Sequence, residues 1–170
     1  MELIEFGRLS EAQYAELVGD EDDPWDAEGS TLQWRPKDHH VGVRDHDGRL
    51  LAAAGLVVAD VRFGEASPIA VVGIGGVIVA AAYRGRGLGR QVISEVVRRA
   101  DDLGPAMAML FCRPDRAGLY RRHGFAVIPS QVIAEQEHGL VEMPPVTMWR
   151  PLNDDARLEA GVVALLGRPF

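Results

Sequence analysis

The chain has 170 residues, of which 47% are hydrophobic and 25% charged, and its formal net charge is −7. This length and composition fit one globular domain over 1–170, and the negative charge argues against general nucleic-acid binding. No apolar run reaches the roughly 18 residues of a membrane span, no secretory signal is visible, and one cysteine excludes an internal disulfide. We therefore expect a soluble, cytoplasmic protein with no membrane and no nucleic-acid partner.

Charge is unevenly distributed along the chain. Eight acidic residues and no lysine or arginine lie between Leu9 and Trp34, whereas nine arginines and four acids lie between Arg84 and Arg122. This asymmetry predicts an anionic ligand near the middle of the chain and favours a cationic ligand near its N-terminal third. The alternative is that both segments are ordinary solvated surfaces.

The first half of the chain predicts strands around one short helix. Residues 3–9 are typical of a strand, and Ser10 is a suitable N-cap for a helix over 11–18. Residues 39–58 predict a hairpin, because two apolar runs flank the turn-forming pair Asp47-Gly48. Residues 68–79 lack polar alternation, which predicts a central strand buried on both faces.

The second half predicts alternating helices and strands. A helix is expected over 87–104, ended by Gly104 and Pro105, and then a buried strand over 106–112. A short helix over 114–124, strands over 125–128 and 146–150 and a helix-like segment over 154–167 follow. The apolar face of the first of these helices consists of Leu88, Val92, Val96, Ala100 and Leu103. Helices interleaved with a mixed sheet give an α/β or α+β fold with one core.

An arginine- and glycine-rich loop, YRGRGLGRQ, lies between the central strand and the helix that follows it. Backbone N–H groups at a helix N-terminus lack partners, and the helix dipole favours negative charge there. Glycines allow close approach of a ligand, and Arg84, Arg86 and Arg90 add charged donors, so the loop suits a phosphate or pyrophosphate. The spacing is neither that of a P-loop nor that of a Rossmann fingerprint. The alternative is that the glycines only begin a helix.

Two motifs resemble those of the GCN5-related N-acetyltransferase (GNAT) superfamily. RGRGLG at Arg84–Gly89 matches its Q/R-x-x-G-x-G/A pattern, and LYRRHGF at Leu119–Phe125 matches its LYxxxGF element, within a block over 71–128. The resemblance implies a mixed sheet that splays between its fourth and fifth strands and binds acetyl-CoA there. The implied acetyl-CoA contacts are Val77, Ile78 and Val79 for the pantetheine arm, and Arg84, Gly85, Arg86, Gly87, Leu88, Gly89 and Arg90 for the phosphates. Before Tyr120, where relatives often have an Asn and a small residue, this sequence has Arg113 and Arg116, which could reach the phosphates of coenzyme A or face water.

Tyr120 is the candidate catalytic residue. Acyl transfer from a thioester expels a thiolate, and a phenol, with an unperturbed pKa of about 10, can donate a proton as that bond breaks. The resemblance gives this role to the tyrosine of the LYxxxGF element. The alternative is a core tyrosine whose hydroxyl finds a partner.

The predicted fourth strand, VVGIGGVIV, departs from the family because several relatives place a glutamate there to deprotonate the attacking amine. Another carboxylate supplies the base, the amine loses its proton to solvent, or catalysis is lost. The final segment could fold back and present a terminal carboxylate. The candidate replacements are Asp26, Glu28, Glu135, Glu142, His138 and the C-terminal carboxylate of Phe170.

The layout also resembles the aminoglycoside 2'-N-acetyltransferase branch of the family, although the strand-four glutamate of that branch is missing. This resemblance implies a primary-amine acceptor on a cationic small molecule, such as an aminoglycoside or polyamine. Trp25 and Trp34 could form an apolar wall of that site, although tryptophans are more often core or rim residues. The candidate acceptor contacts are Asp22, Asp23, Trp25, Asp26 and Glu142. The alternatives are protein or peptide acetylation and a sensor that binds acyl-CoA without turnover. A homodimer, common in the family, stays open.

Two further residue types weigh little in the prediction. His39, His40 and His46 do not form a metal-binding pattern with any cysteine or glutamate, so no metal is expected. Cys112 lies on a predicted buried strand, where an inert thiol is favoured over an acyl-cysteine intermediate.

Overall fold

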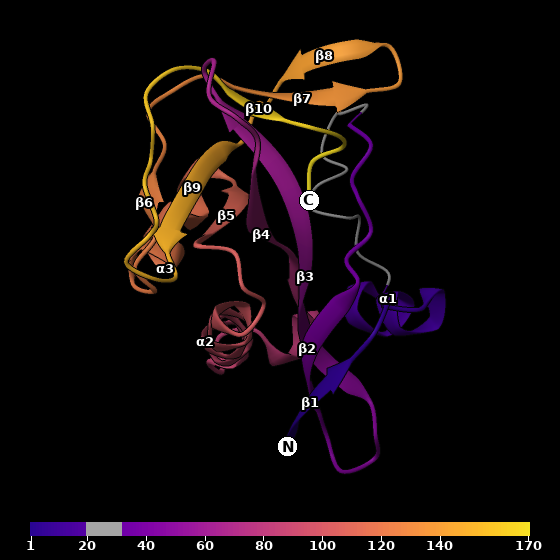
Figure 1. The fold of residues 1–170 in the computed structure, drawn as a ribbon. Helices are drawn as coiled ribbons and strands as arrows, with labels where there is room; N and C mark the ends of the chain where they lie inside the picture. Colours follow the sequence, from indigo (N-terminus) through magenta and orange to yellow (C-terminus); the bar gives the residue numbers. More distant parts are fainter. Residues whose placement is uncertain (20–31) are drawn as a thin grey trace.

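The structure, a computed structural model, describes residues 1–19 and 32–170 (Figure 1). Its elements in chain order are β1 (Glu2–Phe6), α1 (Glu11–Val18), β2 (His39–Arg44), β3 (Leu50–Phe63), β4 (Ile69–Val79), the 3-10 turn η1 (Ala81–Tyr83), α2 (Leu88–Asp101), β5 (Met107–Cys112), the 3-10 turn η2 (Pro114–Arg116), α3 (Ala117–Arg121), β6 (Ala126–Val127), β7 (Val132–Gln136), β8 (Gly139–Glu142), β9 (Val146–Pro151) and β10 (Val163–Leu165).

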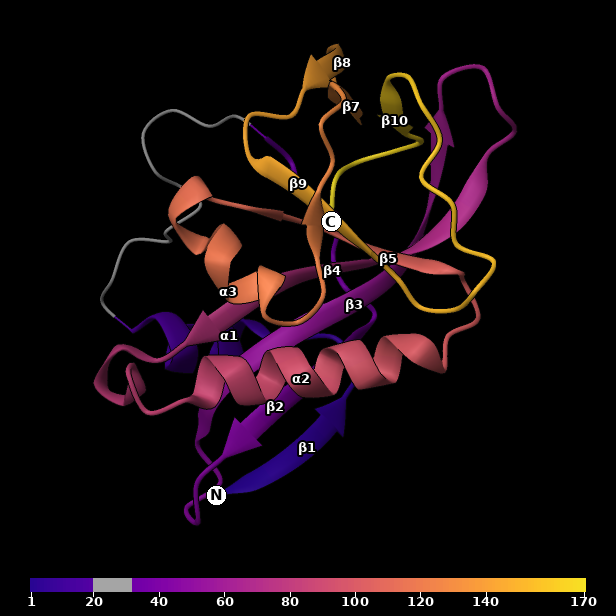
Figure 2. The same cartoon turned by 90° about the vertical axis from the view of Figure 1, so that its left-hand side faces the viewer.

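The strands form one mixed sheet, ten-stranded as counted over the described residues. Its order is β6-β9-β5-β4-β3-β10-β7-β8, and β2 and β1 extend from β3. The pairs β4·β5 and β10·β7 are parallel, and the other pairs are antiparallel. Helix α2 covers one face of the sheet and α1 the other (Figures 1 and 2). The predicted α/β, or α+β, class with a mixed sheet is confirmed.

Strands β4 and β5 separate partway along their length, which confirms the predicted splay. They pair only from Val72 to Ile74 on β4. Beyond Ile74, β4 continues to Val79 on its β3 side, while β5 continues to Cys112 on its β9 side. The register of β3 against β4 shifts after Ala53, and Gly76 has a φ of 60°, a conformation that favours glycine. The divergence leaves one edge of β4 unpaired over its last residues.

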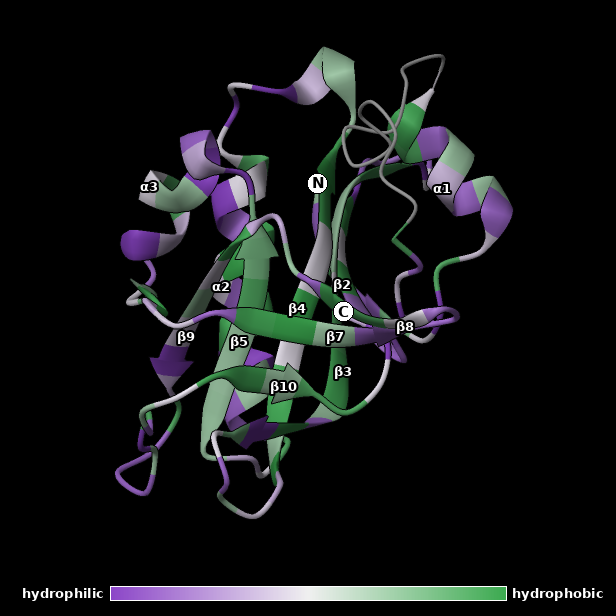
Figure 3. Ribbon diagram, turned by 90° about the horizontal axis from the view of Figure 1, so that it is seen from above, coloured by the Kyte–Doolittle hydropathy of each residue, from purple (hydrophilic) through white to green (hydrophobic). Residues whose placement is uncertain are grey.

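Apolar residues fill both faces of the sheet, and the central strands are the most hydrophobic part of the ribbon (Figure 3). On the α2 face, Leu88, Val92, Val96 and Ala100 are buried, as their helical spacing predicts. The opposite face holds a second cluster that includes β5 side chains and Phe170. Burial on both faces explains why β4 lacks polar alternation.

Local sequence signals place the first helix as predicted. The Ser10 hydroxyl accepts a hydrogen bond from the Gln13 amide, and the Gln13 side chain accepts one from the Ser10 amide. This reciprocal capping satisfies two N–H groups that would otherwise lack partners. No helix among the described residues is both long enough and apolar enough to cross a membrane.

The predicted helix over 154–167 is wrong. The segment forms turns followed by β10, which pairs antiparallel with β3 and parallel with β7. Gly161 and Gly167 lie on either side of β10 and have positive φ values of 109° and 129°, which interrupt a helix. The Val-Ala-Leu residues of β10 are buried between two neighbouring strands. The β7–β8 hairpin is a further element that the sequence analysis does not predict, and α2 ends at Asp101 rather than at 104.

Candidate functional site

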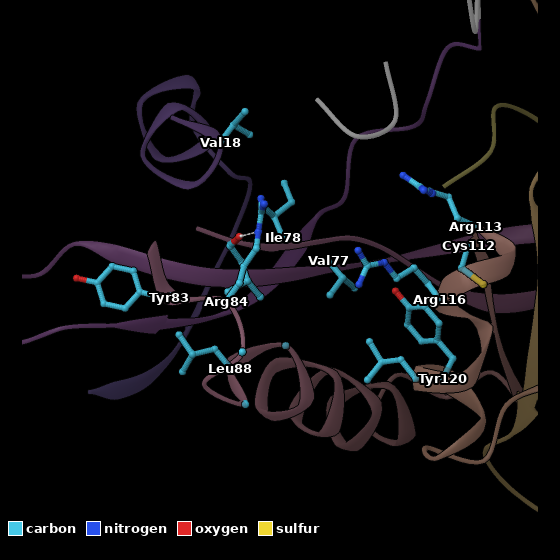
Figure 4. A pocket seen from close by; sticks show the side chains of 15 residues that line it. Val18, Val77, Ile78, Tyr83, Arg84, Leu88, Cys112, Arg113, Arg116 and Tyr120 are labelled. Carbon is cyan, nitrogen blue, oxygen red and sulfur yellow. Dashed lines mark hydrogen bonds between the residues drawn. The ribbon is translucent and has the colours of Figure 1, made fainter. Parts of the chain in front are cut away.

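A cavity of about 360 Å³ opens where β4 leaves β5, between the start of α2 and α3 (Figure 4). It brings together most of the predicted contacts. The predicted residues that line it are Val77, Ile78, Val79, Arg84, Gly85, Gly87, Leu88, Gly89, Arg113 and Tyr120. Cys112, Arg116 and Leu119 complete the side formed by β5, η2 and α3. The loop after β4 and Tyr120, distant in sequence, therefore face one cavity.

The loop presents backbone amides at the start of α2. Gly87 is the N-cap residue in a left-handed conformation, with φ 85°, and it makes no side-chain cap hydrogen bond. The first helical N–H groups consequently lack an intrahelical acceptor and carry the positive end of the helix dipole. No heavy atom lies within 4 Å of the position that a Cβ would take on Gly85 or Gly87. The open space and free amides fit a diphosphate.

The arginines around the cavity differ in where they point. Arg84 folds over the strand, and its Nε donates to the Val79 carbonyl at 3.1 Å. Arg113 and Arg116 line the cavity and share the carboxylate of Asp115 at 3.1 and 3.4 Å. Two other predicted contacts, Arg86 and Arg90, are not among the described lining residues; the Arg86 guanidinium lies 5.1 Å from the centre of the Tyr83 ring. Arg84, Arg113 and Arg116 are thus the arginines that line the described part of the cavity.

Tyr120 is buried, with 7% of its surface exposed, and its hydroxyl faces the cavity. Its ring packs edge-on against Phe125, with centroids 6.3 Å apart. Burial is the main cause that raises the pKa of Tyr120; nearby Cys112 also raises it, and Arg116 partly offsets the increase. No hydrogen-bond partner of the hydroxyl occurs among the described residues. The phenol therefore holds its proton and is free to donate it into the cavity.

Cys112 is fully buried at the end of β5, where its Sγ lies 3.7 Å from the Met148 Sδ. Burial, with a smaller contribution from Asp115, raises the pKa of this thiol to about 11. A thiol with this pKa stays protonated near neutral pH and is a poor nucleophile. The structure therefore favours an inert buried thiol over an acyl-cysteine intermediate.

None of the predicted acceptor-side residues that the structure describes lines the cavity. Asp22, Asp23, Trp25, Asp26 and Glu28 lie outside the described residues. The other candidates lie on the β7–β8 hairpin and are absent from the described lining of the cavity: Glu135, His138 and Glu142. Glu142 is exposed and accepts a hydrogen bond from the Gln131 side chain at 2.9 Å.

Phe170 folds back onto the centre of β4, as the sequence analysis allows. Its ring lies directly over Gly73, in the space that a Cβ would need, and 1% of its surface is exposed. The ring also packs against Phe111, with centroids 5.2 Å apart, and Trp34 contacts the other side of Phe111 at 6.0 Å. Trp34 is thus a partly buried member of this cluster.

Lys37, which the sequence analysis does not select, lies beside the point where the sheet splits. A Cβ on Gly75 would stand 3.2 Å from the Lys37 Nζ and 3.1 Å from the C-terminal carboxyl carbon of Phe170, so the structure places this predicted candidate base beside Lys37. The Lys37 Cβ and Cγ cover Gly55 on β3. Burial lowers the pKa of Lys37 to about 8, and no acid among the described residues forms an ion pair with it. One feature of the sequence could have drawn attention to this residue: Lys37 is the only lysine in the chain.

His40 lies next to Lys37 and is 7% exposed. Its Nδ1 is 2.7 Å from the Gly7 carbonyl, and its Nε2 faces Gly55. Burial lowers the pKa of His40, and the positive charge of Lys37 adds to that effect. The other histidine of interest, His46, groups with Asp45 and Asp47 in an exposed turn, where three ligand atoms lie within 4.8 Å of one another. Exposed acidic groups alone do not define a metal site.

A mixed sheet that splays beside a glycine-rich helix N-terminus, with a tyrosine facing the split, is the architecture of acetyltransferases of the GNAT type. The family model described as "Acetyltransferase (GNAT) family" matches residues 7–125. The chain belongs to this family.

Similar proteins include glucosamine 6-phosphate N-acetyltransferase 1 from Oryza sativa subsp. japonica, which is 38% identical over 90 residues. That match covers 52% of this chain, and the chain spans about half (53%) of the length of this curated relative. A GNAT family N-acetyltransferase (YhbS) from Escherichia coli, solved with CoA, matches with a TM-score of 0.56 and 21% identity over 77% of this chain and 72% of that one. A phosphinothricin acetyltransferase from Sinorhizobium meliloti, solved with AcCoA, matches with a TM-score of 0.50 and 22% identity. That match covers 74% of this chain and 65% of the other. At these identities, the two solved structures are evidence for the fold.

Proposed function

We propose that this chain is an N-acetyltransferase that moves the acetyl group of acetyl-CoA directly to a primary amine. The observation that carries the proposal is one cavity that joins the free amides before α2 to the hydroxyl of Tyr120. The family match and the CoA or AcCoA in solved neighbours support the same co-substrate.

The residues around the cavity fit a coenzyme A thioester. The amides of Gly87 to Gly89 and the guanidinium groups of Arg113 and Arg116 would hold its phosphates. The unpaired edge of β4, over 77–79, offers backbone groups to the amide-rich pantetheine arm. The thioester supplies an activated acyl carbon with a thiolate leaving group.

Tyr120 supplies the proton for that leaving group. Burial keeps the phenol protonated until negative charge develops on the sulfur, and a proton donated at that moment stabilises the transition state. The fixed ring, packed against Phe125, holds the hydroxyl toward the cavity without a competing partner among the described residues. Positioning supplies the remaining acceleration, because the amine and the thioester are held together in one site.

The acceptor is proposed to be a cationic small molecule such as an aminoglycoside or polyamine. The support comes from the sequence, in which eight acids and no lysine or arginine lie between Leu9 and Trp34. Such a concentration of carboxylates attracts ammonium groups and raises the rate of encounter. The rice relative's name gives glucosamine 6-phosphate as its substrate, which makes that amine a second candidate to test.

A sensor that binds acyl-CoA without turnover is the competing function. It is favoured by one observation: the described part of β4, Ile69–Val79, carries no acid that could deprotonate an amine. Protein or peptide acetylation is the other alternative. A single domain over 1–170, a cytoplasmic location and a homodimer stay predictions from the sequence.

Two measurements on purified protein test the proposal. Calorimetric titration with acetyl-CoA measures binding, and release of free thiol measures turnover with kanamycin, spermidine, glucosamine 6-phosphate and a peptide with a free N-terminus. We expect binding of acetyl-CoA and thiol release with at least one amine, lost when the amine is omitted. Binding without thiol release for the whole panel would favour the sensor, and no binding would contradict both functions.

A further inference from the structure

Lys37 is a charged side chain beside the point where the sheet opens. Strand β5 pairs with β4 as far as Ile74, so Gly75 is the first β4 residue beyond the paired region. The Lys37 Nζ lies against this glycine, on the face of the sheet that also holds Phe170. The amine therefore lies at the apex of the split.

If acetyl-CoA binds as the proposed function requires, its acyl group lies at this apex. The phosphate-binding loop follows the C-terminal end of β4, and the cavity runs back along Val79, Ile78 and Val77. An arm anchored at the loop and extended along this edge reaches Gly76 and Gly75 next. Its reactive end is thus directed toward the residue that Lys37 contacts.

The glycines of β4 explain why this strand carries no acid of its own. A Cβ at Gly73 would collide with the Phe170 ring, and a Cβ at Gly75 would meet the Lys37 Cε at 2.8 Å. Any longer side chain at either position would displace these groups. A proton acceptor at this point of the strand must therefore reach over it from another segment, as Lys37 and the C-terminal carboxyl group of Phe170 both do.

We infer that the uncharged amine of Lys37 is the general base that replaces the missing strand-four acid. The lone pair of the acceptor nitrogen forms the C–N bond at the acyl carbon, and the nitrogen's proton passes to Nζ. The C–S bond breaks, its electron pair goes to sulfur, and Tyr120 protonates the thiolate. The proton held on Lys37 then returns through solvent, which restores the amine and the phenol.

The surroundings of Lys37 suit this role. Burial disfavours its charged form, so a substantial fraction of the amine is neutral near pH 8. The titratable groups near it among the described residues are His40, the C-terminal carboxyl group of Phe170 beside Gly75 and, next to it in sequence, Asp38 and His39. Asp38 is engaged by Arg8 at 3.1 Å, and Lys37 covers Gly55 on β3 and Gly75 on β4. Its Nζ also lies 6.0 Å from the centre of the Trp34 ring.

The first experiment observes Lys37 without any acceptor. Because it is the only lysine, protein labelled with ¹³C at lysine Cε gives a single side-chain signal. We expect this signal to titrate near pH 8, well below the usual value of about 10.4. It should shift when a thioether analogue of acetyl-CoA binds, and stay unchanged with adenosine 3',5'-bisphosphate, which lacks the pantetheine arm. A titration near pH 10, or no shift with the analogue bound, overturns the inference.

The second experiment compares Lys37→Arg and Lys37→Met with the wild type in the thiol-release assay. Arginine keeps the charge but does not give up its proton, so both variants should lose kcat by about 10²- to 10⁴-fold. Acetyl-CoA KM should stay within about twofold, and the rise of kcat toward pH 8 should disappear. Arg62→Met, an exposed change on β3, is the control and should match the wild type.

The outcomes separate this inference from the proposed function. Turnover that survives in Lys37→Arg, with acceptor KM raised only in Lys37→Met, would make Lys37 an anion-binding group and overturn its role as base. A wild type that binds acetyl-CoA but acetylates no amine would overturn the proposed function, and the inference with it. Thermal unfolding of each variant shows whether a loss of kcat reflects loss of fold.

Discussion

Tyr120 and Lys37 are two titratable side chains whose protonation is set by the same physical cause. Burial raises the pKa of the phenol, which keeps its proton, and lowers the pKa of the amine, which loses its proton more readily. Burial therefore favours the neutral form of each group. Opposite shifts of an acid and a base are the condition for a matched pair of proton donor and acceptor.

Replacing Tyr120 by phenylalanine removes the hydroxyl and leaves the ring against Phe125. We expect kcat to fall by about 10²-fold or more, because the thiolate must then leave unprotonated. The dissociation constant of acetyl-CoA should change by less than about threefold, since the loop contacts remain. Steady-state kinetics and calorimetry check the two values separately. Equal turnover of the variant and the wild type would remove Tyr120 from the mechanism.

Replacing Lys37 by methionine keeps an unbranched apolar stem and removes the charge. Lowering its pKa from 10.5 to about 8 corresponds to a penalty of up to about 3 kcal/mol for the charged form in the folded state. Below pH 8 the wild type carries this penalty in full. As the pH rises toward about 10.4, the unfolded chain holds a proton that the folded chain has released, and the penalty is relieved.

The Lys37→Met variant should consequently be more stable than the wild type at pH 7, and the difference should shrink by pH 9.5. Urea denaturation at the two pH values measures the free energies of unfolding. A variant that is less stable than the wild type at pH 7 would show that the buried amine has a stabilising partner.

Helix α2 begins with a loop whose backbone conformation needs glycine. Gly87 has a φ of 85°, and a Gly87→Ala change strains this left-handed position by about 1 kcal/mol. Because relief of the strain reorients the first amides of α2, acetyl-CoA affinity should fall more than stability does. Gly118→Ala, inside α3 with no atom within 4 Å of the added Cβ, is the matched control. Equal affinities for both variants would argue against binding of the diphosphate by these amides.

Strand β4 and the final segment are fitted to each other at Gly73. A Gly73→Ala change places a methyl group in the space of the Phe170 ring and should cost about 1–3 kcal/mol, as overpacking does. In a Phe170→Ala background the same change should cost much less, because the collision is absent. Denaturation of the four proteins in this cycle gives the coupling energy. Additive effects would show that the ring does not occupy this position in solution.

Over the whole molecule, the sequence predicts best the parts of the site that are local in the chain. The Arg84–Gly89 loop, the α2 face and Tyr120 all lie in one block, where strand, turn and helix signals follow one another. The prediction of a helix at β10 is wrong because the strand conformation there depends on pairing with β3 and β7, and the periodicity of apolar residues does not reveal strand pairing. Lys37 was missed for the same reason: its contact with Gly75 joins distant segments.

The burial of Lys37 also has a consequence for the surface of the protein. Lys37 is the only lysine, and the other permanently charged basic side chains are arginines. A guanidinium group does not react readily with thioesters. Lys37, which is only partly exposed, is thus the one lysine that an acylating agent could modify. Reagents directed at primary amines, whether fluorescent dyes or crosslinkers, will find a single lysine target on this fold.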